Sequence, residues 1–263
     1  MDFDQLYTAI CNSTHHIKDK MSIFIRTQHG DIKINETKSR KAASVAKLFI
    51  LTEAFRQVEK GILPLDEPVY IGKQSMVGGS GVISYITNPP AFTYRNLIEL
   101  MVIVSDNTAS NTLLDKVGLK NVNNLAMQIG CHESKINRYF MDNDAQANGQ
   151  ENYTSAQDMV ILLKLFTEAN DFITVTSQKQ ILHILLHQQF NDKLSRFQDQ
   201  EGQVAFFHKT GELHRVEHDV AIIKYKNRKI EAAILTEGWE VNGSGQQYIA
   251  AIGALLNDYV KNY

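Results

Sequence analysis

The spacing of apolar and polar residues changes along this chain, and the changes predict the order of its elements. Residues 3 to about 20 carry apolar side chains near helical spacing, which predicts an amphipathic first helix. Segments rich in β-branched and aromatic residues follow on either side of a turn at residues 29–31. They predict a β-hairpin built from Met21–Thr27 and Ile32–Asn35.

The next predicted helix, from Ser44 to Lys60, is apolar on nearly every side in its first half and amphipathic afterwards, and Gly61 ends it. A helix on the protein surface would keep one polar face along its whole length. The pattern therefore predicts a central, buried helix, with Ser44 and Lys47 at its inner end.

Helical spacing continues through the middle of the chain. The predicted helix Tyr94–Val104 stops at Ser105, and Asp106 and Asn107 are suitable caps for a helix that begins there. Residues 130–153 are polar and show little periodicity, and a loop of that length is usually functional or disordered. The other helices are predicted at Asn121–Ile129, Ser155–Ala169 and Thr176–Gln188.

Strand patterning returns at Val204–His208, His218–Tyr225 and Ile230–Thr236, and an amphipathic helix is predicted at Gln246–Tyr259. This order predicts an α/β (α+β) fold, in which an all-α lobe is inserted into an α/β lobe whose sheet is completed from both ends. We expect one domain over residues 1–263, with the α/β lobe at about 1–43 and 190–263 and the all-α lobe at about 44–189.

Composition narrows the possible partners. Hydrophobic residues make up 43% of the chain and charged residues 21%, which is typical of a globular protein with a substantial core. Lys and Arg number 27 against 29 Asp and Glu, and no long run of one charge sign is present. Nucleic acid and membrane surfaces are therefore not expected as partners.

Neither cysteines nor histidines predict a metal site. Cys11 and Cys131 are far apart and have no metal-ligand spacing, so we expect buried free thiols. His183 and His187 stand four residues apart on a predicted helix, but no third ligand is evident. We predict no metal and no cofactor.

The first residues, Met1–Gln5, are acidic where a secretory signal needs positive charge, and no signal-like apolar core follows. The longest apolar runs are broken by Lys or Glu before they reach the roughly 18 residues of a membrane span. The chain as given is expected to be cytoplasmic.

Three short motifs carry candidate chemistry: Ser44-Val45-Ala46-Lys47, Ser105-Asp106-Asn107 and Lys209-Thr210-Gly211. A serine hydroxyl is a poor nucleophile until a base removes its proton, and a lysine can do so only if its pKa falls from about 10.4 towards neutrality. Burial in an apolar helix and a nearby cation would both lower the pKa of Lys47. Lys209 would supply the cation, and with Thr210 it would bind a substrate carboxylate.

The remaining motif residues complete an acyl-transfer site. Ser105 could relay a proton between the base and the leaving group, and the amide of Asn107 could orient a substrate amide. Gly211 allows the backbone to approach closely. The NH groups of Ser44 and Glu212 would then form an oxyanion hole.

The three motifs resemble those of the serine β-lactamase and penicillin-binding-protein superfamily, specifically its class A-like branch. The resemblance covers nearly the whole chain: Gly61–Asp66 resembles the segment after the nucleophile helix, and Leu97–Leu114 resembles the region of the second motif. It implies a β-lactamase/transpeptidase-like fold, with a five-stranded sheet, flanking helices and an all-α lobe.

The long loop departs from this resemblance. Tyr139 stands where the family's loop commonly has tryptophan, and Phe140 stands at the position of the glutamate that activates the hydrolytic water. Asp144 matches an asparagine that helps to hold that water, and Asp142 and Glu151 lie nearby. The resemblance therefore implies slow deacylation unless Asp142 or Asp144 replaces the missing base.

A second departure follows the third motif, at Glu212-Leu213-His214-Arg215, where lactamases typically have small residues. Only the NH of Glu212 is needed, so its side chain is free to point away from the site. His218-Asp219 could be a second acid/base pair, although we favour a structural hydrogen bond. Arg138 and Arg215 could bind a carboxylate, and Arg138 could instead form an ion pair within the loop.

Three functions are compatible with the sequence. The first is a class A β-lactamase-like serine hydrolase that forms an acyl-enzyme on Ser44 with a β-lactam or a related amide or ester. The second is a D-alanyl peptidase, amidase or esterase of the same superfamily. The third is a sensor module that a β-lactam acylates once. Each would bind a small molecule, and none predicts an oligomeric state.

Overall fold

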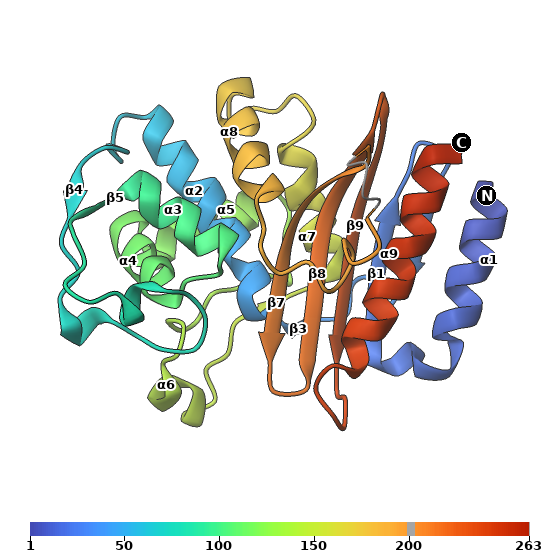
Figure 1. Cartoon of the computed structure of the whole chain (residues 1–263), viewed down its shortest axis with the longest axis horizontal. Coiled ribbons are helices and arrows are strands. Elements are labelled where there is room, and N and C mark those ends of the chain that lie inside the picture. Colours follow the sequence, from blue (N-terminus) through green and yellow to red (C-terminus); the bar gives the residue numbers. More distant parts are fainter. Residues whose placement is uncertain (199–202, 263) are drawn as a thin grey trace.

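The computed structural model describes residues 1–198 and 203–262. A five-stranded antiparallel sheet runs through the protein and separates its helices into two layers, one on each face (Figure 1). The strand order is β2-β1-β9-β8-β7. The strands are β1 (Met21–Arg26), β2 (Asp31–Ile34), β7 (Ala205–Leu213), β8 (Val216–Tyr225) and β9 (Arg228–Glu237). The N-terminal hairpin and the C-terminal meander therefore share one sheet, as the sequence predicts.

One face of the sheet is covered by α1 (Phe3–Thr14) and α9 (Ser244–Asn262), the two helices nearest the chain ends (Figure 1). Leu6 and Ile10 from α1 and Ile249 and Leu256 from α9 pack there against apolar strand residues. The capping box at Asp2 and Gln5 begins α1, because each side chain accepts the backbone NH of the other.

The opposite face of the sheet carries most of the helices. Helices α7 (Ala156–Leu165) and α8 (Val175–Leu186) contact the strands, and α2 (Lys47–Glu59) runs through the centre of the helical block (Figure 1). Buried side chains surround the first half of α2, as its apolar pattern predicts. Around it lie α3 (Tyr94–Ile103), α4 (Asn107–Val117) and α5 (Leu119–Gln128), whereas the short α6 (Asn143–Ala147) lies apart from α2 (Figure 1).

Short elements connect these layers. Four are two-residue strands that form two small sheets: β3 (Arg40–Lys41) with β6 (Tyr153–Thr154), and β4 (Pro68–Val69) with β5 (Phe92–Thr93). Four are 3₁₀-helices: η1 (His15–Lys20), η2 (Ala43–Ala46), η3 (Lys73–Ser75) and η4 (Ile83–Tyr85). The β3–β6 pair brings the end of the long loop beside the segment that leads into Ser44.

The predicted fold class and the order of the main elements are confirmed, and the differences concern boundaries and short elements such as α6, which lies inside the predicted loop. The first helix ends at Thr14, and the kinked η1 follows it, with Ile17 in a non-helical conformation. The helix predicted from Ser44 begins as η2 and becomes α-helical at Lys47. Helices α7 and α8 fall within the segment expected to be all-α, yet they contact the sheet, so the exact division into lobes stays a prediction.

No helix in residues 1–198 and 203–262 combines the length and apolar character needed to cross a membrane.

Candidate active site

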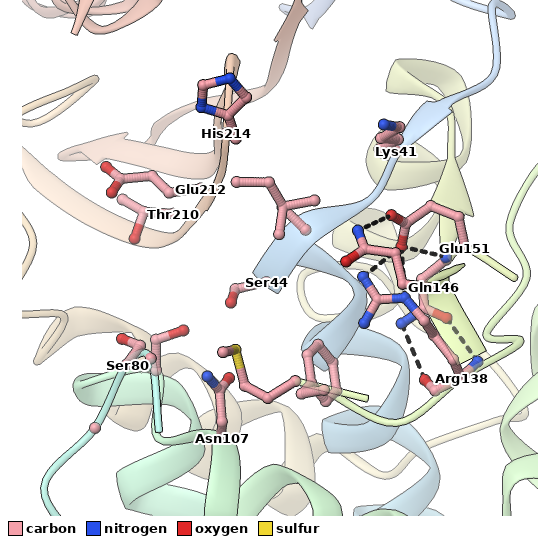
Figure 2. Close-up of a pocket in the computed structure, with 18 of the residues that line it drawn as sticks. Lys41, Ser44, Ser80, Asn107, Arg138, Gln146, Glu151, Thr210, Glu212 and His214 are labelled. Carbon is pink, nitrogen blue, oxygen red and sulfur yellow. Dashed lines mark hydrogen bonds and ion pairs between the residues drawn. The ribbon is translucent and has the colours of Figure 1, made fainter. Parts of the chain in front are cut away.

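Ser44 lies in η2, directly before α2, and Lys47 is the first residue of α2. Side chains three positions apart lie on the same side of a 3₁₀-helix, so this turn places the two residues together. Ser44 lines a cavity of about 820 Å³. In Figure 2 its side chain lies between Thr210 and Glu212 on one side and Asn107 on the other.

The side chain of Lys47 is completely buried, yet its amino group contacts three oxygen acceptors. Nζ donates to the carbonyl oxygen of Ser105 at 2.7 Å, to its Oγ at 3.0 Å and to Oδ1 of Asn107 at 2.8 Å. Burial lowers the pKa of Lys47 well below its ordinary value, the charge of Lys209 lowers it further, and Asp106 opposes both. Lys47 therefore has the environment of a lysine that gives up its proton more readily than an exposed lysine and can then act as a base.

Ser105 lies between two lysines. Its Oγ accepts hydrogen bonds from Nζ of Lys47 and Nζ of Lys209, each at 3.0 Å. Its backbone has a φ of 55°, in the left-handed region that costs a non-glycine residue about 1–3 kcal/mol. The buried surroundings hold this conformation and fix the hydroxyl where it can pass a proton between the two amino groups.

Lys209 is also completely buried, and its Nζ donates a second hydrogen bond to the carbonyl oxygen of Thr210 at 2.9 Å. Burial is the largest cause that lowers its pKa to about 7. Asp219 and Glu212 raise this pKa, and Lys193 lowers it. A lysine with a pKa near 7 is charged in part at neutral pH, so a bound anion would increase its protonation.

Asp106 holds the second motif in place by capping α4 and binding a loop. One carboxylate oxygen accepts the NH of Ala109 at 2.9 Å, and the other accepts the NH groups of Val82 and Ile83 at 2.7 and 2.9 Å. A Cβ on Gly81 would lie 2.3 Å from this carboxylate, and Gly81 has a φ of 110°. The glycine-rich loop at residues 78–81 can therefore approach the site only with glycine at this position.

Asn107 is fixed at both ends of its amide. Oδ1 accepts the hydrogen bond from Lys47, and Nδ2 donates to the carbonyl oxygen of Gly78 at 3.0 Å. Its backbone NH also donates to the carbonyl oxygen of Ser80 at 3.0 Å. The amide therefore faces the cavity in one orientation, as a group that positions a substrate amide requires.

Strand β7 forms the edge of the sheet and packs against η2. A Cβ on Gly211 would lie 3.2 Å from the side chains of Ala43 and Val45 and 3.3 Å from the backbone nitrogen of Ser44. The missing side chain of Gly211 thus lets the outer edge of β7 meet the start of η2. An edge strand leaves backbone groups without a partner strand, so the NH groups of Ser44 and Glu212 form a candidate oxyanion hole.

Phe140 occupies the loop side of the cavity. The loop is held to α4 by two hydrogen bonds between Phe140 and Asn111, from the Phe140 NH to Oδ1 at 2.9 Å and from Nδ2 to the Phe140 carbonyl at 3.0 Å. The ring centroid of Phe140 lies 4.7 Å from Nζ of Lys47. An aromatic ring, which has no proton-accepting carboxylate, therefore covers the amino group at this point.

The acidic residues of the loop either lie outside the cavity or are paired within it. Asp142 caps α6 by accepting the NH of Ala145 at 2.9 Å, and Asp144 is exposed on that helix; neither side chain lines the cavity. Glu151 does line the cavity, but it is buried in an ion pair with Arg138, whose Nη2 lies 2.7 Å from its Oε1. The loop ion pair expected as one role for Arg138 is confirmed.

The remaining sequence candidates hold the structure together. His218 is buried, its Nε2 contacts the carbonyl oxygen of Lys41 at 2.7 Å, and its Nδ1 accepts the NH of Thr236 at 3.0 Å. Burial lowers the pKa of His218 to about 4, so it is neutral at physiological pH. Asp219 accepts the NH of Leu194 at 3.0 Å, and Arg215 donates to the carbonyl of Trp239. The structural role favoured for His218-Asp219 is confirmed.

Both cysteines are free: Cys131 is buried, as expected, whereas Cys11 is only half-buried. The rings of His183 and His187 contact each other at a centroid distance of 4.6 Å. Within residues 1–198 and 203–262, no group of three or more His, Cys, Asp or Glu side chains is placed to hold a metal ion.

Two features of the site are not predicted by the sequence, and the first is the ion pair between Glu212 and Lys193. Glu212 does not turn away from the site: its side chain lines the cavity and forms an ion pair with the buried Lys193. Lys193 itself gave no signal, because it lies in a segment without helical or strand periodicity. The second is the segment at residues 78–81, to which the sequence patterns assign no role, although Gly79, Ser80 and Gly81 line the cavity.

Comparisons with solved structures identify proteins of the same fold. The β-lactamase from Sphaerobacter thermophilus is 24% identical, and the similarity covers 97% of both chains with a TM-score of 0.88. A point mutant of PBP-A, solved as an acyl-enzyme complex with penicillin G, is 20% identical over 97% of this chain and 96% of that chain, with a TM-score of 0.86.

An ancestral class A β-lactamase is 19% identical over 97% of this chain and 99% of that chain, with a TM-score of 0.85. These likenesses establish the β-lactamase/transpeptidase-like fold. A comparison with curated proteins found no significant sequence match. The model of the β-lactamase enzyme family matches residues 5–260, and the chain therefore belongs to the β-lactamase enzyme family, as a β-lactamase-like serine hydrolase.

Proposed function

We propose that the protein is a serine hydrolase that forms an acyl-enzyme on Ser44 with β-lactams or related amides and esters. The observation that carries this proposal is the buried Lys47, one 3₁₀ turn from Ser44, with a pKa well below its ordinary value. A buried lysine with a lowered pKa, one turn from a serine hydroxyl at the wall of a cavity, is an arrangement that can activate a serine nucleophile.

In the proposed acylation step, neutral Lys47 removes the proton from Oγ of Ser44 while Oγ forms a bond to the substrate carbonyl carbon. The carbonyl oxygen becomes negatively charged and is bound by the NH groups of Ser44 and Glu212. The tetrahedral intermediate then collapses, and the bond from the carbonyl carbon to the leaving nitrogen or oxygen breaks. Ser105 gives its proton to the leaving atom and regains one from Lys47.

The other motif residues would bind the substrate. Lys209 and Thr210 would hold a carboxylate through the partly charged amine and the hydroxyl group. Asn107 would orient the amide on the acyl side of the substrate. A penicillin is supported as a substrate class by the PBP-A relative, whose acyl-enzyme complex with penicillin G shares this fold.

Deacylation is proposed to be slow. A hydrolytic water needs a base close to the acyl-serine, and the loop places the ring of Phe140 beside Lys47 instead. This ring also favours the second candidate function, a module that remains acylated and signals the presence of a β-lactam. Acylation is common to both functions, and only the lifetime of the adduct separates them.

Intact-mass spectrometry with benzylpenicillin and a chromogenic cephalosporin tests the proposal. We expect a stoichiometric adduct on the wild-type protein, a burst followed by slow release, and no adduct on Ser44→Ala. D-alanyl peptides and simple esters tested in parallel would identify a peptidase or esterase. Absence of both adduct and turnover with every compound would rule out the proposed function.

A further inference from the structure

A completely buried lysine lies behind the wall of the cavity. The side chain of Lys193 is 0% exposed, and its Nζ forms an ion pair with Oε1 of Glu212, whose own side chain is 61% exposed. Glu212 lines the cavity, whereas Lys193 does not reach its surface. The Glu212 carboxylate therefore stands between a buried positive charge and the space that receives substrate.

The ion pair lies at the end of the cavity where a substrate carboxylate is proposed to bind. Successive side chains of a strand point to opposite faces, so Thr210 and Glu212 on β7 share one face. Figure 2 shows the two side chains next to each other, beyond Ser44. Lys193 and Glu212 also act on the pKa of Lys209, in opposite directions, after the larger effects of burial and Asp219.

A buried ammonium group needs a nearby anion, because burial without one is strongly unfavourable. In the described part of the chain, Lys193 pairs with Glu212 and, more weakly, with Asp192, whose Oδ1 lies 4.0 Å from Nζ. That Oδ1 atom is buried and has no hydrogen-bond partner. Glu212 therefore provides most of the neutralising charge, and it does so from the substrate side.

We propose that the carboxylate of Glu212 occupies the place of a substrate carboxylate on Lys193, so that it weakens the binding of a substrate carboxylate to Lys209 and Thr210 and lowers the preference of the site for substrates that carry one. Such a substrate must either displace Glu212 from Lys193 or bind next to its negative charge, and both alternatives are unfavourable. A substrate with an ester or amide at this position avoids both. This inference deepens the proposed function and rests on it.

The experiment compares benzylpenicillin with its methyl ester, which differ at this carboxylate. The readout is the ratio of their second-order acylation rate constants, acid over ester, measured by intact-mass spectrometry. Because both rates come from the same protein preparation, partial misfolding of a variant cancels in the ratio. Glu212→Gln keeps the backbone NH of the oxyanion hole, and we expect it to raise the ratio about tenfold, since one negative charge beside the carboxylate is removed.

Two further variants locate the effect. Glu240→Gln removes an exposed carboxylate at the same net change in charge, and we expect it to leave the ratio unchanged. Lys193→Met in the Glu212→Gln background removes the ammonium group that the substrate carboxylate would gain, and we expect the ratio to fall back towards that of the wild type.

Binding to the unreactive Ser44→Ala protein separates this inference from acyl transfer itself. Calorimetry should show that Glu212→Gln raises the affinity for the acid relative to the ester in this background as well. If wild type is not acylated but this affinity ratio changes as expected, the proposed function fails and the inference stands. An unchanged ratio in both assays, or no binding of either compound, overturns the inference.

Discussion

The two walls of the cavity differ in how they treat charge. On the wall formed by η2, α4 and β7, two buried lysines share the hydroxyl of Ser105, and each makes further hydrogen bonds to oxygen atoms. On the loop wall, the charged groups Arg138 and Glu151 neutralise each other. On that wall the ring centroid of Phe140 lies 4.7 Å from Nζ of Lys47.

The two walls correspond to the two halves of the proposed hydrolytic cycle, acylation and deacylation. Acylation needs a base, a proton relay and an oxyanion hole, and the first wall supplies candidates for all three. Deacylation needs a second base that can reach a water molecule, and the acids of the loop wall are occupied in an ion pair or directed outward. The motifs of the family therefore provide candidates for the proposed acylation step, whereas the loop provides no candidate base for the last step.

Replacing the base should have the largest effect. We expect Lys47→Met to lower the acylation rate constant about 10³-fold, because a general base contributes about 10²–10⁴-fold. The fold should persist, since methionine fills the buried site without a charge. Intact-mass time courses measure the rate, and Lys33→Met, at an exposed lysine, is the control. Acylation within tenfold of wild type would identify a different base.

Removing charge from the loop wall should lower the free energy of unfolding but leave acylation intact. Glu151→Gln leaves the buried guanidinium of Arg138 without a carboxylate, and we expect it to lower the free energy of unfolding by about 3 kcal/mol. Urea unfolding measures this loss, with Glu240→Gln as the exposed control. Acylation by the folded protein should continue, because Glu151 contacts neither Ser44 nor Lys47. A parallel loss of acylation would show that the two walls act together.

Placing a base on the loop wall should convert slow release into turnover. We expect Phe140→Glu to accelerate deacylation about 10²-fold, at the lower limit for general-base catalysis. Phe140→Gln has nearly the same shape without a base and separates proton abstraction from simple opening of space. Release rates of the penicilloyl adduct provide the measurement. Equal acceleration in both variants would mean that the ring acts only by excluding water.

The smallest expected effect is a dependence on pH. With a pKa of about 7, Lys209 loses its charge as the pH rises, so acylation by benzylpenicillin should be about fivefold slower at pH 8 than at pH 7 from this group alone. The methyl ester should lack this decrease. The effect of pH on stability has the opposite sign. The unfolded chain keeps the Lys209 proton up to about pH 10.5, whereas the folded protein loses it near pH 7, so folding becomes more favourable between pH 7 and 10.

The sequence predicts the first wall well because local chemistry determines it. Asp106 is recognisable as a helix cap from its residue type and the helix that follows, and Ser44 and Lys47 are related by one turn. The edge position of β7 follows less directly, because it depends on which strands pair. What the sequence could not distinguish is the 3₁₀ geometry of η2, since one apolar turn looks the same in both kinds of helix.

The second wall was less predictable because tertiary contacts determine it. The five-residue α6 and the two-residue strands β3 and β6 are too short to show a period. The sequence register placed Asp142 and Asp144 close to the site but gave no direction for their side chains. Lys193 could not be predicted as a site residue, because only the tertiary fold brings it into contact with Glu212.

Ser105 has a consequence for the evolution of this protein. Its left-handed backbone would suit glycine better, so selection for stability alone would favour replacing it. Such a glycine would remove the oxygen that both lysines contact. Under the proposed mechanism, a library screened only for thermal stability would therefore drift towards glycine at this position and lose the proton relay, while a library screened for acylation would keep serine.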